Sequence, residues 1–254
     1  MSIEYSSAEL LAVSANREMV GINTIFAGVG IPLLAALLAK HTHRPRLTIV
    51  VEGGSIGPEV LPGYLPISTN EMRISHRAQQ LINITDIFLL TQRGFLEVGF
   101  IGGAQIDQYG NINTTVIGPY EKPKVRLPGS GGANDIASLC REFIIVTKHE
   151  RRRFVPKVDF VTSPGYLRGG NSRREAGLIF GGVRRVITDL AIMGFEDETK
   201  RMKLEYLQPG ATADQVIENT GFELLIPDEV PVAEPPSVDE LEHLRRIDVD
   251  RRFL

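Results

Sequence analysis

The chain has 254 residues, of which 43% are hydrophobic and 23% are charged, and its formal net charge is -3 at pH 7. This length and composition suit a folded α/β domain with a large core. The small negative charge gives no indication of a nucleic-acid partner. The single cysteine, Cys140, excludes an internal disulfide, and its helix-like surroundings favour a buried thiol over a nucleophile.

The N-terminal segment and the apolar runs bear on the location of the protein. Residues 1–5 include an acidic residue and lack the apolar region of a signal peptide. No apolar run approaches the roughly 20 residues that a membrane-spanning helix needs. We therefore expect a cytoplasmic protein with neither a membrane nor a nucleic-acid partner.

Strands and helices alternate along the first part of the chain. Ser7 can cap a first helix, and a strand is expected over residues 22–27. The tight turn Gly28-Val29-Gly30 follows, and the apolar run 33–40 predicts a buried helix. The next strand ends at Glu52. This strand–turn–helix–strand order predicts a βαβ unit and a parallel sheet.

The rest of the chain continues this pattern. Residues 86–90 fit either a strand or the end of a helix, and segments 212–218 and 238–246 predict short helices. Further strands are expected over residues 96–101, 143–147, 158–162, 183–189 and 202–207. We predict an α/β fold with an open, mostly parallel sheet flanked by helices. One domain spans residues 1–226, and residues 227–254 form a proline-rich connection and a C-terminal tail.

The strand that ends at Glu52 presents a carboxylate just before two glycines. Its β-branched residues indicate a strand that is buried on both faces, and no residue nearby in the sequence pairs with Glu52. Burial of an unpaired carboxylate costs free energy, so one interpretation is a nucleophile or a base. The other is a strand-end glutamate that is bonded to a loop amide. The segment alone leaves both open.

Two further glycine-rich turns could hold an anion. Gly28 and Gly30 precede a helix, and amides at a helix start can bind anions, although a tight turn without a ligand explains these glycines as well. Gly131, Gly132 and Ala133 also lead into a helix. Consecutive free amides at such a place can form an oxyanion hole or a phosphate cradle. A purely structural loop is the alternative there.

The basic run over residues 148–153 contains Arg152 and Arg153. Such a run usually forms a solvated surface, but arginine forks also suit the phosphates of a nucleotide-like cofactor. The five histidines are scattered, and neither a metal-binding spacing nor a Gly-x-Ser-x-Gly motif occurs. We therefore predict no metal site and no serine hydrolase.

Together, these motifs resemble those of the class I CoA-transferases, and among them the beta subunit of glutaconate CoA-transferase. The similarity keeps its order over nearly the whole chain and is carried by Val51-Glu52-Gly53-Gly54 and by segments 100–107, 109–111, 129–134, 149–154, 161–165 and 218–222. One departure is the sequence Gly53-Gly54-Ser55 after Glu52, which differs from the glutaconate enzyme. This departure leaves the acid substrate open.

The resemblance implies a site and a reaction. Glu52 matches the catalytic glutamate of the family, which lies in a Glu-x-Gly element at a strand end. The implied reaction moves CoA between an acyl-CoA and a carboxylic acid, with a dicarboxylic acid as one option, through a covalent glutamyl-CoA thioester. CoA thioester is then a substrate, and no cofactor is bound. The family's glycine-rich loop beside the active site matches residues 129–133, so Gly131, Gly132 and Ala133 are the candidate oxyanion donors. For the CoA phosphates, the turn at Gly28 and Gly30 rivals Arg152 and Arg153, and the resemblance does not decide between them.

The resemblance also implies a partner, a homologous alpha subunit, in either a heterodimer or a heterotetramer. Two alternative functions remain open. One is a CoA-thioester hydrolase or decarboxylase on the same scaffold, and the other is a non-catalytic ligand-binding protein. Glu52 favours transfer, because related hydrolases and decarboxylases tend to alter the glutamate position.

Overall fold

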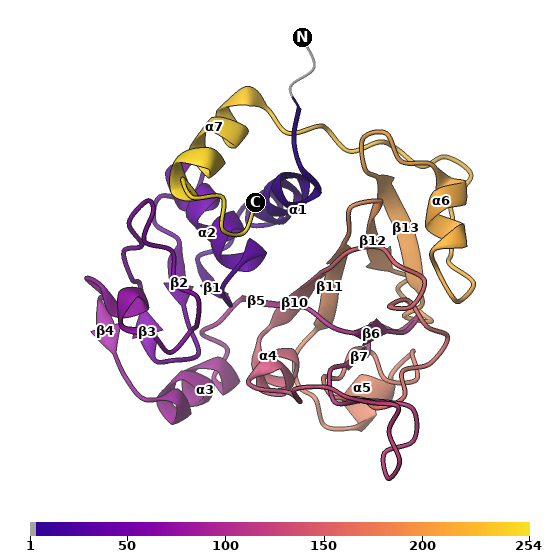
Figure 1. The fold of residues 1–254 in the computed structure, drawn as a ribbon. Coiled ribbons are helices and arrows are strands. Elements are labelled where there is room, and N and C mark those ends of the chain that lie inside the picture. The colour runs from indigo at the N-terminus through magenta and orange to yellow at the C-terminus, as the bar shows by residue number, and fades with distance from the viewer. Residues whose placement is uncertain (1–3) are drawn as a thin grey trace. The chain divides into compact units, whose positions relative to one another are not determined.

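The computed structural model describes residues 4–254 and separates into two compact units (Figure 1). The first unit contains the chain up to Phe100 together with Pro235–Leu254, and the second contains Ile101–Glu234. The predicted division at residues 226 and 227 remains a prediction. Residues 1–3, which belong to the segment used to argue against a signal peptide, lie outside the described residues.

The first unit is built on parallel strands. Strand β1 (Thr24–Phe26) pairs in parallel with β2 (Thr48–Val50) on one side and with β5 (Val98–Ile101) on the other. The short strands β3 (Ser55–Ile56) and β4 (Gln80–Leu81) continue the sheet beyond β2 in antiparallel pairing. The parallel pairing of β1 with β2 confirms the predicted βαβ unit.

Helices α1 (Ser7–Arg17), α2 (Ile31–His41) and α7 (Val238–Ile247) pack together in the first unit. The cap of α1 is Ser6, one residue before the predicted Ser7, in a capping box with Glu9. Helix α2 joins β1 to β2 and is buried along its apolar run, as predicted. The segment with two interpretations at residues 86–90 is helical, and the remaining helices of this unit are α3 (Ile84–Gln92) and the 3-10 helix η1 (Met72–Ser75).

The second unit contains four longer strands. Strand β10 (Glu142–Val146) pairs in parallel with β11 (Gly182–Ile187), and β12 (Ala191–Phe195) and β13 (Met202–Leu207) continue in antiparallel order. The smaller elements of this unit are β6 (Gln105–Ile106) paired with β7 (Ile112–Asn113), β8 (Val116–Ile117) paired with β9 (Val125–Arg126), and the helices α4 (Ala133–Leu139), α5 (Ser172–Glu175) and α6 (Ala213–Glu218). The predicted α/β fold class is confirmed. Cys140 is buried at the end of α4, as expected, and burial raises the pKa of its thiol to about 12.

Residues 158–162 do not form a strand, so that prediction was wrong. The Asp159 carboxylate accepts hydrogen bonds from the Gly118 amide at 2.9 Å and from Nε2 of Gln105 at 3.0 Å. The Asp159 amide donates to Oε1 of Gln105 at 3.0 Å. Because side chains satisfy these polar groups in place of a neighbouring strand, the segment follows an irregular path.

Arg173 fixes several loops of the second unit. Its side chain is buried and donates to the carbonyls of Ala137, Pro164, Gly165 and Phe180 at 2.7–3.0 Å. These carbonyls satisfy the guanidinium, and burial lowers its pKa to about 10. One side chain thus joins α4, the turn at residues 164 and 165, and the segment that leads into β11. No helix among residues 4–254 is long and apolar enough to cross a membrane.

His149, which belongs to the basic run, is also buried in this unit. Its ring stacks on Phe154 with 4.4 Å between the ring centroids. Its two nitrogens lie 2.9 Å and 3.1 Å from the hydroxyl oxygens of Thr188 and Thr220. Burial lowers the pKa of His149 from 6.5 to about 4, so the folded protein favours the neutral ring.

We expect the free energy of unfolding to fall as the pH is lowered from 6.5 to 4. The pKa of His149 is lower in the folded state than in the unfolded state, so the unfolded chain binds more protons in this window and protonation favours unfolding. This contribution amounts to at most about 3 kcal/mol. Urea denaturation at pH 7 and at pH 4.5 measures it.

The control for this experiment is the exposed His76. His149→Gln keeps a donor and an acceptor but does not titrate in this range, so it should weaken the pH dependence, of which His41, whose pKa burial also lowers, keeps a share. His76→Gln should leave the pH dependence as in the unaltered protein. An unchanged pH dependence in His149→Gln would contradict this assignment.

Candidate active site

Glu52 lies in the tight turn that joins β2 to β3. The Gly54 amide donates to the Val51 carbonyl at 3.0 Å, and the Val51 amide donates to the Ser55 carbonyl at 3.0 Å. Glu52 is partly exposed, and its carboxylate has no hydrogen bond or ion pair among the described residues of the first unit. The expected alternative, a bond to a loop amide, is therefore not found in this unit. An accessible carboxylate that is not engaged can act as a nucleophile.

The two glycines after Glu52 are required by a close backbone approach. A Cβ atom on Gly53 would collide with the carbonyl oxygen of Thr69, and one on Gly54 would collide with the carbonyl oxygen of Ile82. Gly54 also has a φ of 103°, which side chains of L-residues rarely tolerate. The Ile82 amide donates to the Gly54 carbonyl at 3.0 Å. These contacts fix the turn that carries Glu52.

The turn at Gly28 and Gly30 lies at the same sheet edge as Glu52. In the parallel register of β1 and β2, Phe26 is opposite Val50, so Gly28 and Glu52 both follow their strands by two residues. Gly30 is the N-cap of α2 with a φ of 88°, and no side chain caps this helix. The positive end of α2 therefore lies at the edge where Glu52 stands, and it favours negative charge there.

The C-terminal residues pack beside the same turn. The buried carboxylate of Asp248 accepts hydrogen bonds from the amides of Arg252, Phe253 and Leu254 at 2.8–3.2 Å. The Phe253 ring lies 4.0 Å from the position that a Cβ atom on Gly30 would occupy. Part of the predicted tail is thus folded onto a candidate anion site.

In the second unit, Gly131 and Gly132 lead into α4. Gly129 and Gly131 have φ values of 95° and 47°, which glycine tolerates. The Ala133 amide donates to the Ser130 carbonyl at 3.0 Å, so it is already occupied in this conformation. The amides of Gly131 and Gly132 have no partner among the described residues of this unit. Of the three predicted oxyanion donors, Gly131 and Gly132 therefore have amides without a partner in this unit, and the role itself remains a prediction.

Arg152 and Arg153 share one carboxylate. The Nε atoms of both donate to Oε2 of Glu150 at 2.9 Å, and these bonds lower the pKa of Glu150. Arg153 also donates to the Gly103 carbonyl at 2.9 Å, whereas the side chain of Arg152 is 77% exposed. These contacts fit the solvated surface that such basic runs usually form. Phosphate binding by Arg152 and Arg153 remains a prediction.

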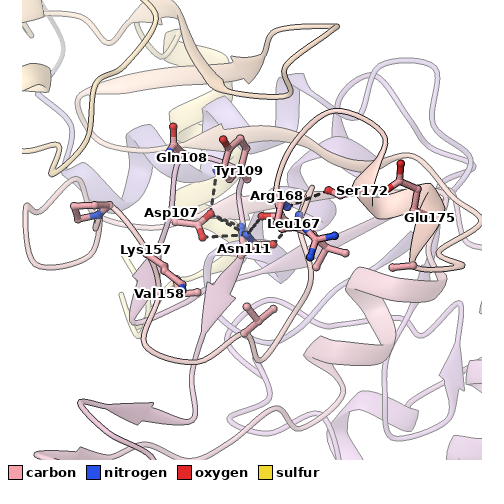
Figure 2. A pocket seen from close by; sticks show the side chains of 13 residues that line it. Asp107, Gln108, Tyr109, Asn111, Lys157, Val158, Leu167, Arg168, Ser172 and Glu175 are labelled. Atoms are coloured by element: carbon pink, nitrogen blue, oxygen red, sulfur yellow. Dashed lines mark hydrogen bonds between the residues drawn. The ribbon is translucent and has the colours of Figure 1, made fainter.

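The second unit also contains a cavity of about 610 Å³ that the sequence did not single out (Figure 2). Its lining joins the turn at residues 107–111 to residues 156–176. The turn itself is visible in the sequence as Tyr109-Gly110-Asn111. No sequence pattern joins it to the later segment, because that contact depends on tertiary structure.

Comparison with known proteins identifies the family. Residues 17–219 match the model of the coenzyme A transferase family. The chain belongs to the coenzyme A transferase family. It is 41% identical over 245 residues to the beta subunit of 3-oxoadipate CoA-transferase from Pseudomonas knackmussii, covering 96% of this chain and 94% of that protein. It is 38% identical over 244 residues to the beta subunit of glutaconate CoA-transferase from Acidaminococcus fermentans, covering 93% and 91%.

Solved structures agree with this family. The crystal structure of glutaconate CoA-transferase from Acidaminococcus fermentans matches with a TM-score of 0.93 and 35% identity, over 98% of this chain and 97% of that chain. The decarboxylase AibA/AibB matches with a TM-score of 0.84 and 26% identity, over 98% of both chains. The predicted resemblance to a CoA-transferase beta subunit is confirmed. The same fold also occurs in a decarboxylase.

Replacement of Gly54 by alanine should destabilise the protein more than replacement of Gly21. Both glycines have a positive φ, 103° and 82°, but a Cβ atom on Gly21 meets no atom within 4 Å. Gly21→Ala should therefore cost only about 1–2 kcal/mol of backbone strain. Gly54→Ala must also move the Ile82 carbonyl, so its loss of unfolding free energy should be clearly larger. Urea denaturation of the two variants compares them, and equal losses would show that the approach of Ile82 is not a constraint.

Proposed function

We propose that this chain is the glutamate-bearing subunit of a CoA-transferase, which moves CoA between an acyl-CoA and a carboxylic acid. The observation that carries this proposal is the Glu52 carboxylate. It is partly exposed, it has no partner in its own unit, and a rigid turn holds it at the end of a parallel strand. The two beta-subunit relatives are named for 3-oxoadipate and glutaconate, which are dicarboxylic acids. We therefore propose a dicarboxylic acid as a substrate.

The proposed reaction passes through two covalent intermediates on Glu52. The carboxylate attacks the thioester carbonyl of the acyl-CoA and expels CoA thiolate, which leaves an acyl–glutamyl anhydride. The thiolate then attacks the glutamyl carbonyl, releases the first acid and forms a glutamyl-CoA thioester. A second acid attacks this thioester, and the same steps in reverse yield the new acyl-CoA and free Glu52. Each bond that forms is matched by one that breaks, and the transfer is divided into easier steps.

Each attack places negative charge on a carbonyl oxygen that needs hydrogen-bond donors. We propose the amides of Gly131 and Gly132 for this role, since both are free in their unit. One such donor contributes roughly 3 kcal/mol to transition-state stabilisation in other enzymes. The positive end of α2 at Gly28 and Gly30 would favour the charge of Glu52 itself. Water has to be excluded, because it would hydrolyse the anhydride or the thioester.

We further propose that a homologous alpha subunit completes the enzyme, since the named relatives are beta subunits. Both a heterodimer and a heterotetramer fit this proposal, and a cytoplasmic location remains a prediction from the sequence. A decarboxylase on this fold is one alternative, which the likeness to AibA/AibB supports, and a CoA-thioester hydrolase is another. The Glu52 carboxylate favours transfer over these alternatives and over a non-catalytic ligand-binding protein.

The chain expressed alone should be inactive and should self-associate. Residues 64–72 include Thr69, whose carbonyl lies against Gly53 in the Glu52 turn. This segment carries exposed apolar side chains, since Tyr64, Ile67 and Met72 are exposed to 65%, 63% and 84%. Such a patch favours association in water when no partner covers it. Size-exclusion chromatography with light scattering compares the chain with and without the alpha subunit. A stable monomer that transfers CoA would overturn this prediction.

Glu52→Gln should remove CoA transfer while the fold and the assembly are kept, because the amide has nearly the same shape but cannot attack a thioester. We expect the transfer kcat of the co-expressed complex to fall by at least about 10⁴-fold. The matched control is Glu59→Gln, since Glu59 is an exposed glutamate of the same unit whose carboxylate pairs with Arg77.

Steady-state assays with several acyl-CoA donors and acid acceptors measure both variants. Glu59→Gln should keep its turnover. Turnover in Glu52→Gln, once deamidation back to glutamate is excluded, would place the nucleophile elsewhere. Acyl-CoA hydrolysis without any transfer by the unaltered complex would favour the hydrolase alternative.

A further inference from the structure

The residues that follow α7 return to the turn between β1 and α2. Phe253 lies there, with its ring 4.0 Å from the position that a Cβ atom on Gly30 would occupy, and it is only partly exposed. The buried carboxylate of Asp248 fixes the backbone of this segment, because it accepts hydrogen bonds from the amides of three residues, Phe253 included. Nη1 of Arg252 also donates to the Leu65 carbonyl at 3.1 Å. Phe253 therefore has a defined place beside this turn.

Gly28, in the same turn, is a glycine that neither its conformation nor its neighbours in the chain require. Its φ lies outside the left-handed region, and a Cβ atom on it would meet no atom within 4 Å. Gly53 and Gly54 differ from it, because backbone carbonyls approach both of them closely. A glycine that its own unit does not require is explained by a ligand that approaches the backbone. The space over Gly28 is thus open to a substrate.

This space lies beside Glu52 and is bounded by Phe253. Gly28 and Glu52 each follow their strands by two residues in the parallel register of β1 and β2, and neighbouring strands are about 4.8 Å apart. Gly30 comes two residues after Gly28, and two residues of chain span at most about 7 Å. An acyl group that is joined to Glu52 needs space at this edge. The backbone at Gly28 and the ring of Phe253 form two sides of that space.

The ring suits the carbon chain of an acyl group better than a charged group. It offers no hydrogen-bond donor, so a phosphate or a carboxylate placed against it would lose hydration without gaining a partner. Methylene groups, by contrast, gain free energy when they are buried against an apolar surface. The part of a substrate that reaches Phe253 is therefore a run of methylene groups.

We propose that Phe253 determines which acyl groups the enzyme accepts, an inference that rests on the proposed transferase function. The carbon chain of the acyl group passes between the backbone at Gly28 and the ring of Phe253. An unbranched chain fits between them, whereas a branched chain requires the ring to move. Asp248 and Arg252 resist this movement, because they hold the backbone that carries the ring. Phe253 is thus a specificity residue that the C-terminal segment supplies.

Kinetics with two donors of equal length and charge test this assignment in the complex of both subunits. One donor is glutaryl-CoA, and the other is 3,3-dimethylglutaryl-CoA, whose chain is wider. Phe253→Ala should raise the ratio of kcat/KM for the wider donor to kcat/KM for the narrow donor by at least about tenfold, the effect of one or two methylene groups in an apolar pocket. Phe253→Leu should change this ratio in the same direction by less. A loss of stability alone would lower both values together and leave their ratio unchanged.

Two further variants control the experiment. Phe95→Ala removes an aromatic ring that is 60% exposed at the opposite end of β1, where the Thr24 hydroxyl donates to the Phe95 carbonyl at 2.6 Å. This variant should leave the ratio unchanged. Gly28→Ala should keep the unfolding free energy, since its methyl group meets no atom of the unit, but should lower kcat/KM for both donors about tenfold and more for the wider one.

Titration calorimetry with two CoA thioethers adds a readout that needs no turnover. The thioethers carry the straight and the dimethylated carboxyalkyl chain and cannot react, because they lack the thioester carbonyl. Phe253→Ala should shift their relative affinity toward the wider chain by at least about tenfold. An unchanged affinity ratio in Phe253→Ala, or an unchanged affinity for both thioethers in Gly28→Ala, would overturn the proposal. Absence of transfer in the unaltered complex would count against the transferase function, whereas the titration would still decide the role of Phe253.

Discussion

The approach of two backbone carbonyls to the turn after β2 is the constraint on which the catalytic account depends. The oxygens of Thr69 and Ile82 leave no space for side chains at Gly53 and Gly54. The turn is held on both sides, and Glu52 extends from it without a partner in its unit. A nucleophile needs a defined position, because small displacements of reacting atoms cost large factors in rate. Gly53 and Gly54 therefore allow the close backbone contacts that fix the position of the carboxylate, and this effect matters more than the space they leave around it.

In the second unit, side chains form hydrogen bonds with the backbone of irregular segments and thereby fix the conformation of those segments. Arg173 satisfies the carbonyls of three segments, and Asn111 holds both polar backbone groups of Leu167. Buried polar groups need such partners, because an unsatisfied one costs about 1–3 kcal/mol. The long connection between β10 and β11 is thereby shaped without regular strands. The bonds of Asn111 also hold part of the lining of the cavity in this unit.

Sequence patterns predicted the elements that depend on local chemistry. The apolar run predicted α2, β-branched runs predicted the buried strands, and the carboxylate before two glycines singled out Glu52. The strand predicted over residues 158–162 is absent, because Asp159 forms hydrogen bonds with Gln105, which lies far away in the sequence. Two further contacts could not be predicted from the sequence, because both depend on the conformation of the loops. One is the hydrogen bond from the Ala133 amide to the Ser130 carbonyl. The other is the pairing of Arg152 and Arg153 with the same carboxylate of Glu150. The reason for glycine at residue 53 also lies in a contact with a distant segment.

The most direct test of this account is to trap the covalent intermediate and locate it. The complex is incubated with an acyl-CoA and no acceptor acid, and the subunits are then analysed by intact mass and peptide mapping. A duplicate sample is first reduced with borohydride, which converts a glutamyl thioester to an alcohol. The account predicts CoA on this chain, with the reduced residue at Glu52. A CoA adduct or a reduced residue at another position, in a complex that turns over, would contradict it.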